Sequence, residues 1–230
     1  MPGRDNFPEN VPMIQLYSGP LSLFSAKVRI ALAEKNLPYE RIDVPFNNST
    51  GYAPKHPEVV ARNPKAQVPV LVDGDVSLYD STIIIEYLED RHPEPPLFPR
   101  DPAAKALCRQ REAASDEILF PHVLDLIREV FYKPDPAARD AAKIEAARAA
   151  ILAIYGELDE VLATRTHVCG DFSVADVAYF VTVMFATQLG AAPPESLKNL
   201  QTWLGRVSAR PSVNAEIQYI LDAAKRVPAT

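Results

Sequence analysis

Residues 14–32 read Ile-Gln-Leu-Tyr-Ser-Gly-Pro-Leu-Ser-Leu-Phe-Ser-Ala-Lys-Val-Arg-Ile-Ala-Leu, and the rest of the chain is organised around this segment. Ile14 and Leu16 alternate with more polar neighbours, which is typical of a half-buried strand. Further along, apolar residues recur at every fourth position, as on the buried face of a helix, at Phe24, Val28 and Leu32. The segment therefore predicts a strand that leads directly into a helix.

The loop between these two elements ends beside two serines. Ser18, Gly19 and Pro20 are residue types that favour a tight turn. Ser22 and Ser25 then fall where the first backbone N–H groups of the helix lack carbonyl partners. Because those amides and the helix dipole both favour negative charge, this helix start would stabilise a bound thiolate or carboxylate.

Length and composition indicate a globular chain. With 230 residues, 47% of them hydrophobic, it can form one large or two small domains with real cores. It has no uninterrupted apolar run of about eighteen residues, so no membrane-spanning helix is expected. Residues 1–12 are polar and contain prolines, without the order of a secretory signal, and we interpret them as a loose tail. We therefore expect a cytoplasmic protein that does not insert into membranes.

Charge and cysteine content narrow the class of partner. The net charge of −6 argues against nucleic-acid binding, which requires a basic surface. Cys108 and Cys169 are far apart in the sequence, and neither has metal-ligand spacing to the four histidines. We predict that both are reduced and mostly buried, and we expect no metal cofactor. A small molecule is the expected partner.

The segments that follow the first helix continue a small α/β domain over residues 13–92. Residues 39–44 predict a second strand, which a right-handed crossover would place parallel to the first. Residues 45–62 are polar and irregular, with one short helix expected at 57–61.

A hairpin and a helix complete this domain. Residues 68–72 and 76–79 predict two antiparallel strands joined at Asp73-Gly74. Asp80-Ser81 then begins a helix that runs to about residue 91. Together these elements predict a four-stranded mixed sheet with helices, which is a thioredoxin-like α/β layout.

The remaining chain is predicted to be a linker followed by an all-helical domain. Prolines crowd residues 93–101, which we interpret as the linker, and residues 102–230 form the helical domain. Asp101-Pro102 and Asp135-Pro136 each provide an N-cap and a first-turn proline, so each should begin a helix of about twenty-five residues. Pro121 should bend the first of these helices.

A capping box predicts another helix start in the second half of the chain. Ser173 can cap this helix, and Asp176 three residues later can reach back to it. The residues that follow, as far as Leu189, are apolar on nearly all sides, which indicates a central, buried helix. An amphipathic helix around Trp203 follows, and Arg210-Pro211-Ser212 separates it from a last one.

Five segments, in this order, resemble those of the cytosolic glutathione transferase superfamily. They are Leu16-Tyr17 with Ser22 and Lys27-Val28-Arg29, Asn63-Pro64 leading to Gln67-Val68-Pro69-Val70-Leu71, Asp80-Ser81 with Ile84, Glu86, Tyr87 and Leu88, Gly170-Asp171-Phe172-Ser173-Val174-Ala175-Asp176, and Arg210-Pro211-Ser212-Val213. The resemblance extends from about Met13 to Val213, and its pattern is most similar to serine-type phi, theta, zeta and bacterial members. It implies the same two-domain fold, with glutathione as co-substrate.

The resemblance implies that Ser22 is the catalytic residue. Its hydroxyl would donate to the glutathione sulfur, and the helix start would add positive charge. Lowering a thiol pKa of about 8.5 by about two units requires roughly 2.7 kcal/mol, which one such hydrogen bond and the dipole can supply. Ser22 could instead be only a loop or cap serine, although Ser25 is the expected cap, and Tyr17 is an alternative donor. With serines at both positions of the C-x-x-C motif, dithiol redox chemistry is excluded.

The resemblance also assigns glutathione-binding residues. Val68-Pro69 matches a cis-proline step that turns the backbone of Val68 toward the cysteine residue of the tripeptide. Asp80 and Ser81 match residues for the γ-glutamyl end, with Ser81 receiving the carboxylate and Asp80 facing the ammonium group, and both roles are compatible with N-capping. Gln67 and Lys55 match residues for the rest of the tripeptide, although Lys55 could equally be only solvated.

The second substrate is expected to be a small hydrophobic electrophile that lies against the helical domain. Candidates for its binding wall are Leu21, Phe24, Phe120, His122, Leu126, Phe131 and Tyr132. The resemblance implies a homodimer and a role in detoxification. Alternatives are a glutathione-dependent lyase, dehalogenase, isomerase or peroxidase, and a non-catalytic protein that binds glutathione, another ligand or a partner.

Overall fold

The computed structural model describes residues 13–226, so the tail expected at residues 1–12 lies outside the described residues. The first part contains β1 (Ile14–Ser18), α1 (Leu23–Glu34), β2 (Tyr39–Asp43), α2 (Pro57–Arg62), β3 (Val70–Asp73), β4 (Val76–Tyr79) and α3 (Ser81–Arg91). The strands pair in the order β2-β1-β3-β4, with β2 parallel to β1 and the other pairs antiparallel. The predicted four-stranded mixed sheet is confirmed.

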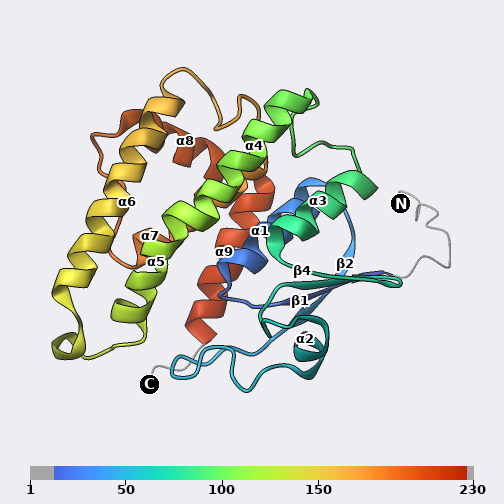
Figure 1. Ribbon diagram of the computed structural model, residues 1–230, viewed down its shortest axis with the longest axis horizontal. Helices are drawn as coiled ribbons and strands as arrows, with labels where there is room; N and C mark the ends of the chain where they lie inside the picture. Colours follow the sequence, from blue (N-terminus) through green and yellow to red (C-terminus); the bar gives the residue numbers. More distant parts are fainter. Residues whose placement is uncertain (1–12, 227–230) are drawn as a thin grey trace, which may run out of the picture.

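The sheet is covered on both faces, because successive side chains of a strand point to opposite sides. Leu16 and Leu71 belong to the main core, while Tyr17 and Val70 belong to a smaller cluster that includes Val59 of α2. Figure 1 shows α1 and α3 on one side of the sheet and α2 on the other. The side with α1 and α3 faces the helical part of the molecule, so α1 lies between the sheet and the helices.

The second part is mostly helical, as predicted. Its helices are α4 (Pro102–Ala114), α5 (Phe120–Leu126), α6 (Ala141–Leu162), α7 (Val174–Gln188), α8 (Lys198–Ser208) and α9 (Pro211–Arg226). Asp101 caps α4 by accepting a hydrogen bond from the Ala104 N–H at 2.8 Å. The wider, π-helical turn η1 (Ser115–Leu119) joins α4 to α5 just before Pro121, and it accommodates a residue without an N–H donor.

The prediction of a long helix beginning at Asp135-Pro136 is wrong. Only the 3₁₀ turn η3 (Pro136–Ala138) forms there, because the Asp135 carboxylate accepts from the Ala137 N–H at 2.9 Å and Arg139 is extended. The helix α6 begins at Ala141 instead, after Asp140, whose side chain accepts from the Lys143 N–H at 3.1 Å. Asp is a favoured N-cap residue at both positions, but only Asp135 is followed by a proline, so the local pattern pointed to the wrong Asp residue.

The capping box at the start of α7 is confirmed, and it anchors the helical core. The Ser173 N–H donates to Asp176 Oδ2 at 2.9 Å. Asp176 Oδ1 accepts from the Val168 N–H at 3.0 Å and from the indole N–H of Trp203 at 2.8 Å. Nearly every residue of the first three turns of α7 is buried, as expected for a central helix.

Candidate functional site

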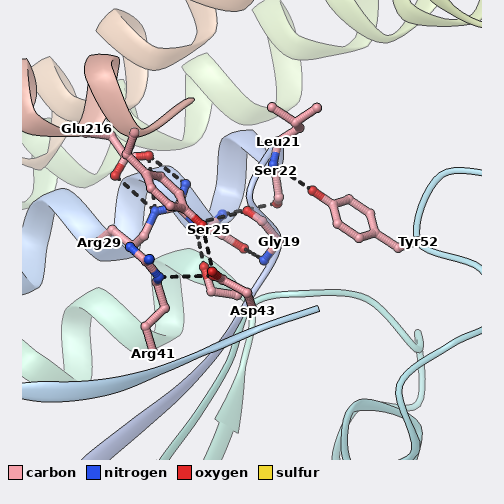
Figure 2. Close-up of polar contacts among 11 residues, drawn as sticks. Gly19, Leu21, Ser22, Ser25, Arg29, Arg41, Asp43, Tyr52 and Glu216 are labelled. Carbon is pink, nitrogen blue, oxygen red and sulfur yellow. Dashed lines mark hydrogen bonds and ion pairs between the residues drawn. The ribbon is translucent and has the colours of Figure 1, made fainter. Parts of the chain in front are cut away.

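Ser22 is the N-cap of α1. It has an extended backbone, and its Oγ accepts a hydrogen bond from the Ser25 N–H at 3.2 Å. The prediction that Ser25 is the cap is therefore wrong, because Ser25 is the third helical residue and is the donor that the cap satisfies. The buried Oγ of Ser25 instead accepts from the Gly19 N–H at 3.1 Å and holds the loop before the helix (Figure 2).

Capping leaves the Ser22 hydroxyl free to donate. The bond from Ser25 occupies a lone pair of the oxygen, whereas donation uses the hydroxyl hydrogen, so the two roles are compatible. Ser22 is partly exposed and lines a cavity of about 490 Å³. A cap and a hydrogen-bond donor to a bound ligand can thus be the same side chain.

This cavity, named here the aromatic cavity, is lined by side chains of both parts of the molecule. From the predicted wall it contains Leu21, Phe24, Phe120, Phe131 and Tyr132, and its further lining residues include Phe46, Tyr52, Leu124, Ile127, Met184, Phe185, Ile217 and Leu221. None of the described residues that line it is charged. The aromatic cavity is therefore suited to a neutral, apolar molecule.

Two residues predicted for the wall do not line the aromatic cavity. Leu126 is fully buried in the core, and His122 lies on another side of the same helical segment. Phe120, Leu124 and Ile127 line the cavity because residues spaced by three or four positions share one helical face.

Tyr52 lines the aromatic cavity, and no pattern in the sequence pointed to it. Its Oη accepts a hydrogen bond from the Leu21 N–H at 2.9 Å, which links the loop after β2 to the loop that carries Ser22 (Figure 2). Burial raises the pKa of the Tyr52 phenol. A Cβ at Gly19 would lie 2.5 Å from this oxygen, so the close approach of Tyr52 requires glycine there.

A second cavity of about 450 Å³, named here the charged cavity, contains most of the residues predicted to bind glutathione. These are Gln67, Val68, Pro69, Asp80 and Ser81. The predicted cis peptide bond between Val68 and Pro69 is present. Lys55 does not line the cavity and is exposed, whereas Lys65 lines it. Sequence reasoning thus found the β3 and α3 side of this cavity and chose a different lysine.

The start of α3 forms one end of the charged cavity. Ser81 is buried, and Asp80 caps the helix by accepting from the Thr82 N–H at 3.1 Å. Asp80 has a φ of 76°, a backbone conformation that is costly for a residue other than glycine and that is often found at functional sites. The helix start offers backbone N–H groups to an anion, and the Asp80 carboxylate lies beside it for a cation.

The helical part contributes acidic side chains to the same cavity. Asp116 and Glu117 line it together with residues 80–82 at the start of α3. The ammonium group of Lys27, which is fully buried on α1, lies 2.5 Å from Asp116 Oδ2 and 2.5 Å from Glu112 Oε1. The Thr82 hydroxyl also donates to Glu112, at 2.8 Å.

The cluster of Lys27, Glu112 and Asp116 has one more negative than positive group. Asp116 Oδ1 and Glu112 Oε2 are buried and have no partner among the described residues. Burial, together with the Glu112 carboxylate, raises the pKa of Asp116 to about 6, although Lys27 opposes the rise. The wall is therefore complementary to a ligand cation. The four-residue spacing of Glu112 and Asp116 on one helical face was the signal that the sequence offered.

The two cavities adjoin at Phe24, which lines both. Its ring packs edge-on against Phe120, with 4.8 Å between the centroids. Tyr17, the alternative donor, lines neither cavity; it is buried, and its ring packs against His56 at 5.3 Å. A ligand that places its charged end beside Ser81 can extend past Phe24 toward Ser22.

Residues 13–226 contain neither a cluster of metal ligands nor a membrane-spanning helix. No group of three or more histidine, cysteine, aspartate or glutamate side chains in this range is placed to hold a metal ion. No helix in this range is both long and apolar enough to cross a membrane. Cys108 and Cys169 are free, with Cys108 buried and Cys169 partly buried.

Comparison with known proteins agrees with this architecture. Residues 16–96 match the model of the glutathione S-transferase N-terminal domain, and residues 116–211 match that of the C-terminal domain. The chain is 31% identical over 207 residues to a stringent starvation protein A homolog of Coxiella burnetii. The aligned region covers 89% of this chain and 91% of that protein.

Solved structures show the same fold. A glutathione S-transferase from Rhodospirillum rubrum is 31% identical, with a TM-score of 0.79 over 89% of this chain and 91% of that one. A theta-class glutathione S-transferase from Xanthomonas axonopodis pv. citri, solved with glutathione bound, is 26% identical. Its TM-score is 0.79, over 90% of this chain and 97% of that one. From its domains and its relatives, this chain belongs to the cytosolic glutathione transferase superfamily.

Proposed function

We propose that the protein is a serine-type glutathione transferase in which Ser22 holds the sulfur of bound glutathione as a thiolate. The observation that carries this proposal is the Ser22 hydroxyl, which has its oxygen fixed by the Ser25 N–H and its hydrogen free, at the positive end of α1. The ionised sulfur is the nucleophile that attacks an electrophile.

The charged cavity is proposed to hold the rest of the tripeptide. The γ-glutamyl carboxylate would lie at Ser81 and the start of α3, and the ammonium group would lie beside Asp80, toward the acidic wall of Asp116. The backbone of Val68 would pair with the cysteine residue, and Gln67 would contact the remaining peptide. Lys65 replaces Lys55 in our proposal as the cation for a ligand carboxylate, because Lys65 lines the cavity.

The aromatic cavity is proposed to bind the electrophile. Since none of its described lining residues is charged and many are aromatic, a neutral aromatic or aliphatic molecule fits it better than an ion does. Such a substrate would present its reactive carbon to the sulfur near Ser22. Attack forms the new carbon–sulfur bond and expels the leaving group with the bonding electrons.

The substitution Ser22→Ala tests the role of the hydroxyl. Turnover with an activated haloaromatic should fall about ten- to a hundred-fold, which corresponds to about 1.4–2.7 kcal/mol, while glutathione affinity changes little. The variant Ser22→Thr, which keeps a hydroxyl, is the matched control and should retain most of the activity. Turnover of Ser22→Ala equal to that of the wild type over the whole pH range would refute the role.

A different reaction on the same thiolate is an alternative within the same site. A lyase, dehalogenase, isomerase or peroxidase would use the same glutathione contacts, and the product formed from each member of a substrate panel distinguishes them. A conjugate in which glutathione replaces a leaving group supports the transferase.

A non-catalytic role is the second candidate function, because one relative that is 31% identical is named a stringent starvation protein A homolog and not a transferase. Retention of the protein on immobilised glutathione without conjugation of any activated haloaromatic would support a binding role. Failure to bind glutathione at all would support a role in interaction with another protein.

We also propose that the protein is a cytoplasmic homodimer that acts in detoxification. The first domain of one subunit would contact the second domain of the other across a two-fold axis. Sedimentation equilibrium of the purified chain should give twice the 25.4 kDa mass of one subunit.

A further inference from the structure

We propose that Tyr52 is a second hydrogen-bond donor to the glutathione sulfur, beside Ser22. The inference rests on the proposed function, and it adds a catalytic residue from the loop between β2 and α2. The site would then stabilise the thiolate with two hydroxyl groups that come from different segments of the chain.

The two hydroxyl-bearing side chains are neighbours. A Cβ built at Gly19 would lie 2.5 Å from Tyr52 Oη and 2.9 Å from Ser22 Cβ. Both side chains therefore approach Gly19 from the same side of the loop. Both also line the aromatic cavity. Figure 2 shows the Tyr52 hydroxyl directed at the loop segment that carries Leu21 and Ser22.

Each hydroxyl has its accepting role filled by a backbone amide. Tyr52 Oη accepts from the Leu21 N–H at 2.9 Å, and Ser22 Oγ accepts from the Ser25 N–H at 3.2 Å. In the part of the chain that the structure describes, neither hydroxyl hydrogen has an acceptor. Both hydrogens are therefore available for a third group, and an anionic sulfur is the strongest acceptor that the proposed reaction brings to this place.

The Tyr52 ring is held in position, so that donation costs little conformational entropy. It packs edge-on against Phe46, with 4.9 Å between the centroids, and Phe46 in turn packs against Phe131 at 5.9 Å. Burial raises the pKa of the phenol, which keeps it protonated at neutral pH. A fixed, protonated hydroxyl is suited to stabilising negative charge throughout the working range of the enzyme.

A double-mutant cycle with Ser22→Ala and Tyr52→Phe tests the proposal. The pKa of the bound thiol is measured from the ultraviolet absorbance of the thiolate, and glutathione affinity is measured by calorimetry. Tyr52→Phe should raise the pKa of the bound thiol by about half to one unit. At pH values below that pKa, the thiolate fraction then falls about three- to tenfold. The same rise should appear when Ser22 is already Ala.

The Ser22→Ala background separates donation from positioning. If Tyr52 only held the loop that carries Ser22, removing its hydroxyl would change nothing once the Ser22 hydroxyl is gone, and that result would overturn the proposal. Tyr87→Phe is the control, because it removes a phenol hydroxyl that donates to Asp73 outside both cavities. It should leave the thiol pKa unchanged.

A second variant covers the case in which Tyr52→Phe disturbs the loop. Tyr52→3-fluorotyrosine keeps the ring and the acceptor for the Leu21 N–H but has a more acidic phenol, so the bound thiol pKa should fall. An unchanged thiol pKa in this variant also counts against donation. If the wild type fails to bind glutathione, the proposed function and this inference fail together; if it binds and only Ser22→Ala raises the thiol pKa, this inference alone fails.

Discussion

Ser22 illustrates how one side chain can serve both the fold and the site. Its oxygen caps α1 and its hydrogen remains free, so removing the hydroxyl affects stability as well as chemistry. The two effects can be measured separately because glycine replaces a capping serine at much lower cost than alanine does.

We expect Ser22→Ala to lower the free energy of unfolding by about 1 kcal/mol and Ser22→Gly by only a few tenths. Both variants lack the hydroxyl, so both should lose turnover to a similar extent. Urea denaturation and steady-state kinetics on the two proteins provide the test. If Ser22→Gly, which remains more stable than Ser22→Ala, also kept more of its turnover, the proposed donor role would be contradicted.

Asp116 makes the stability of the folded protein depend on pH. Its folded-state pKa of about 6 lies above the ordinary carboxyl value of 3.8 because of burial, with Lys27 opposing the shift and Glu112 and Asp80 adding to it. A raised carboxyl pKa contributes stability at low pH, and this contribution is lost as pH rises from about 4 to about 6.

The stability of the wild type relative to Asp116→Asn should therefore fall by on the order of 2 kcal/mol between about pH 4 and pH 6.5, and then stay level. Urea denaturation of both proteins over this range measures the difference. Glu117→Gln, which changes the neighbouring acidic residue of the cavity wall, is the matched control. A difference that rose with pH would show that Lys27 dominates over burial.

At the scale of elements, α1 carries the site into contact with the rest of the molecule. Its first residues follow Ser22, and its second turn contributes Lys27 and Arg29, which are buried against carboxylates of the helical part. The sequence showed the apolar stripe of this helix. It could not show that the charged side is buried as well, because the partners are about 85 and 187 residues away.

The start of α7 depends on a single carboxylate. Asp176 is fully buried and accepts hydrogen bonds from Val168, Ser173 and Trp203. Asp176→Ala should lower the free energy of unfolding by about 3–5 kcal/mol, because several buried donors would lose their partner. Asp176→Asn keeps one acceptor oxygen and should cost clearly less. Urea denaturation compares them, and equal losses would contradict this account.

At the scale of the whole molecule, a buried ion pair joins α1 to α9. The Arg29 guanidinium donates to both oxygens of Glu216, at 2.6 to 3.1 Å, and to the Gly19 carbonyl of the site loop at 3.0 Å. Figure 2 shows this contact next to the loop that carries Ser22. Through it, the last helix supports the first strand-to-helix turn.

We expect Glu216→Ala to cost about 3–5 kcal/mol of stability, because it leaves the Arg29 charge buried without its partner. Asp222→Ala removes an exposed ion pair with Lys225 on the same helix and should cost less than about 1 kcal/mol. Thermal or urea unfolding of the two variants checks this. Similar losses would mean that burial of the Arg29 pair is unimportant.

The sequence by itself determined most of the elements and the nature of the fold. Alternation at Ile14 and Leu16, four-residue spacing in α1 and the capping box at Ser173 are local patterns, and they report local structure correctly. The resemblance of the segments around Val68-Pro69 and Asp80-Ser81 to those of glutathione transferases, and not a local pattern, led to one side of the charged cavity. The local signals survive because propensity, capping and periodicity involve residues that are close along the chain.

Only the tertiary structure decided which distant groups meet. It placed Tyr52 beside Ser22, and it lined the charged cavity with Asp116 and with Lys65, but not with Lys55. It also decided between Asp135 and Asp140 as the helix start, because both side chains can cap a first turn. Contacts between side chains tens of residues apart depend on how whole elements pack, and no local pattern of residues encodes that packing.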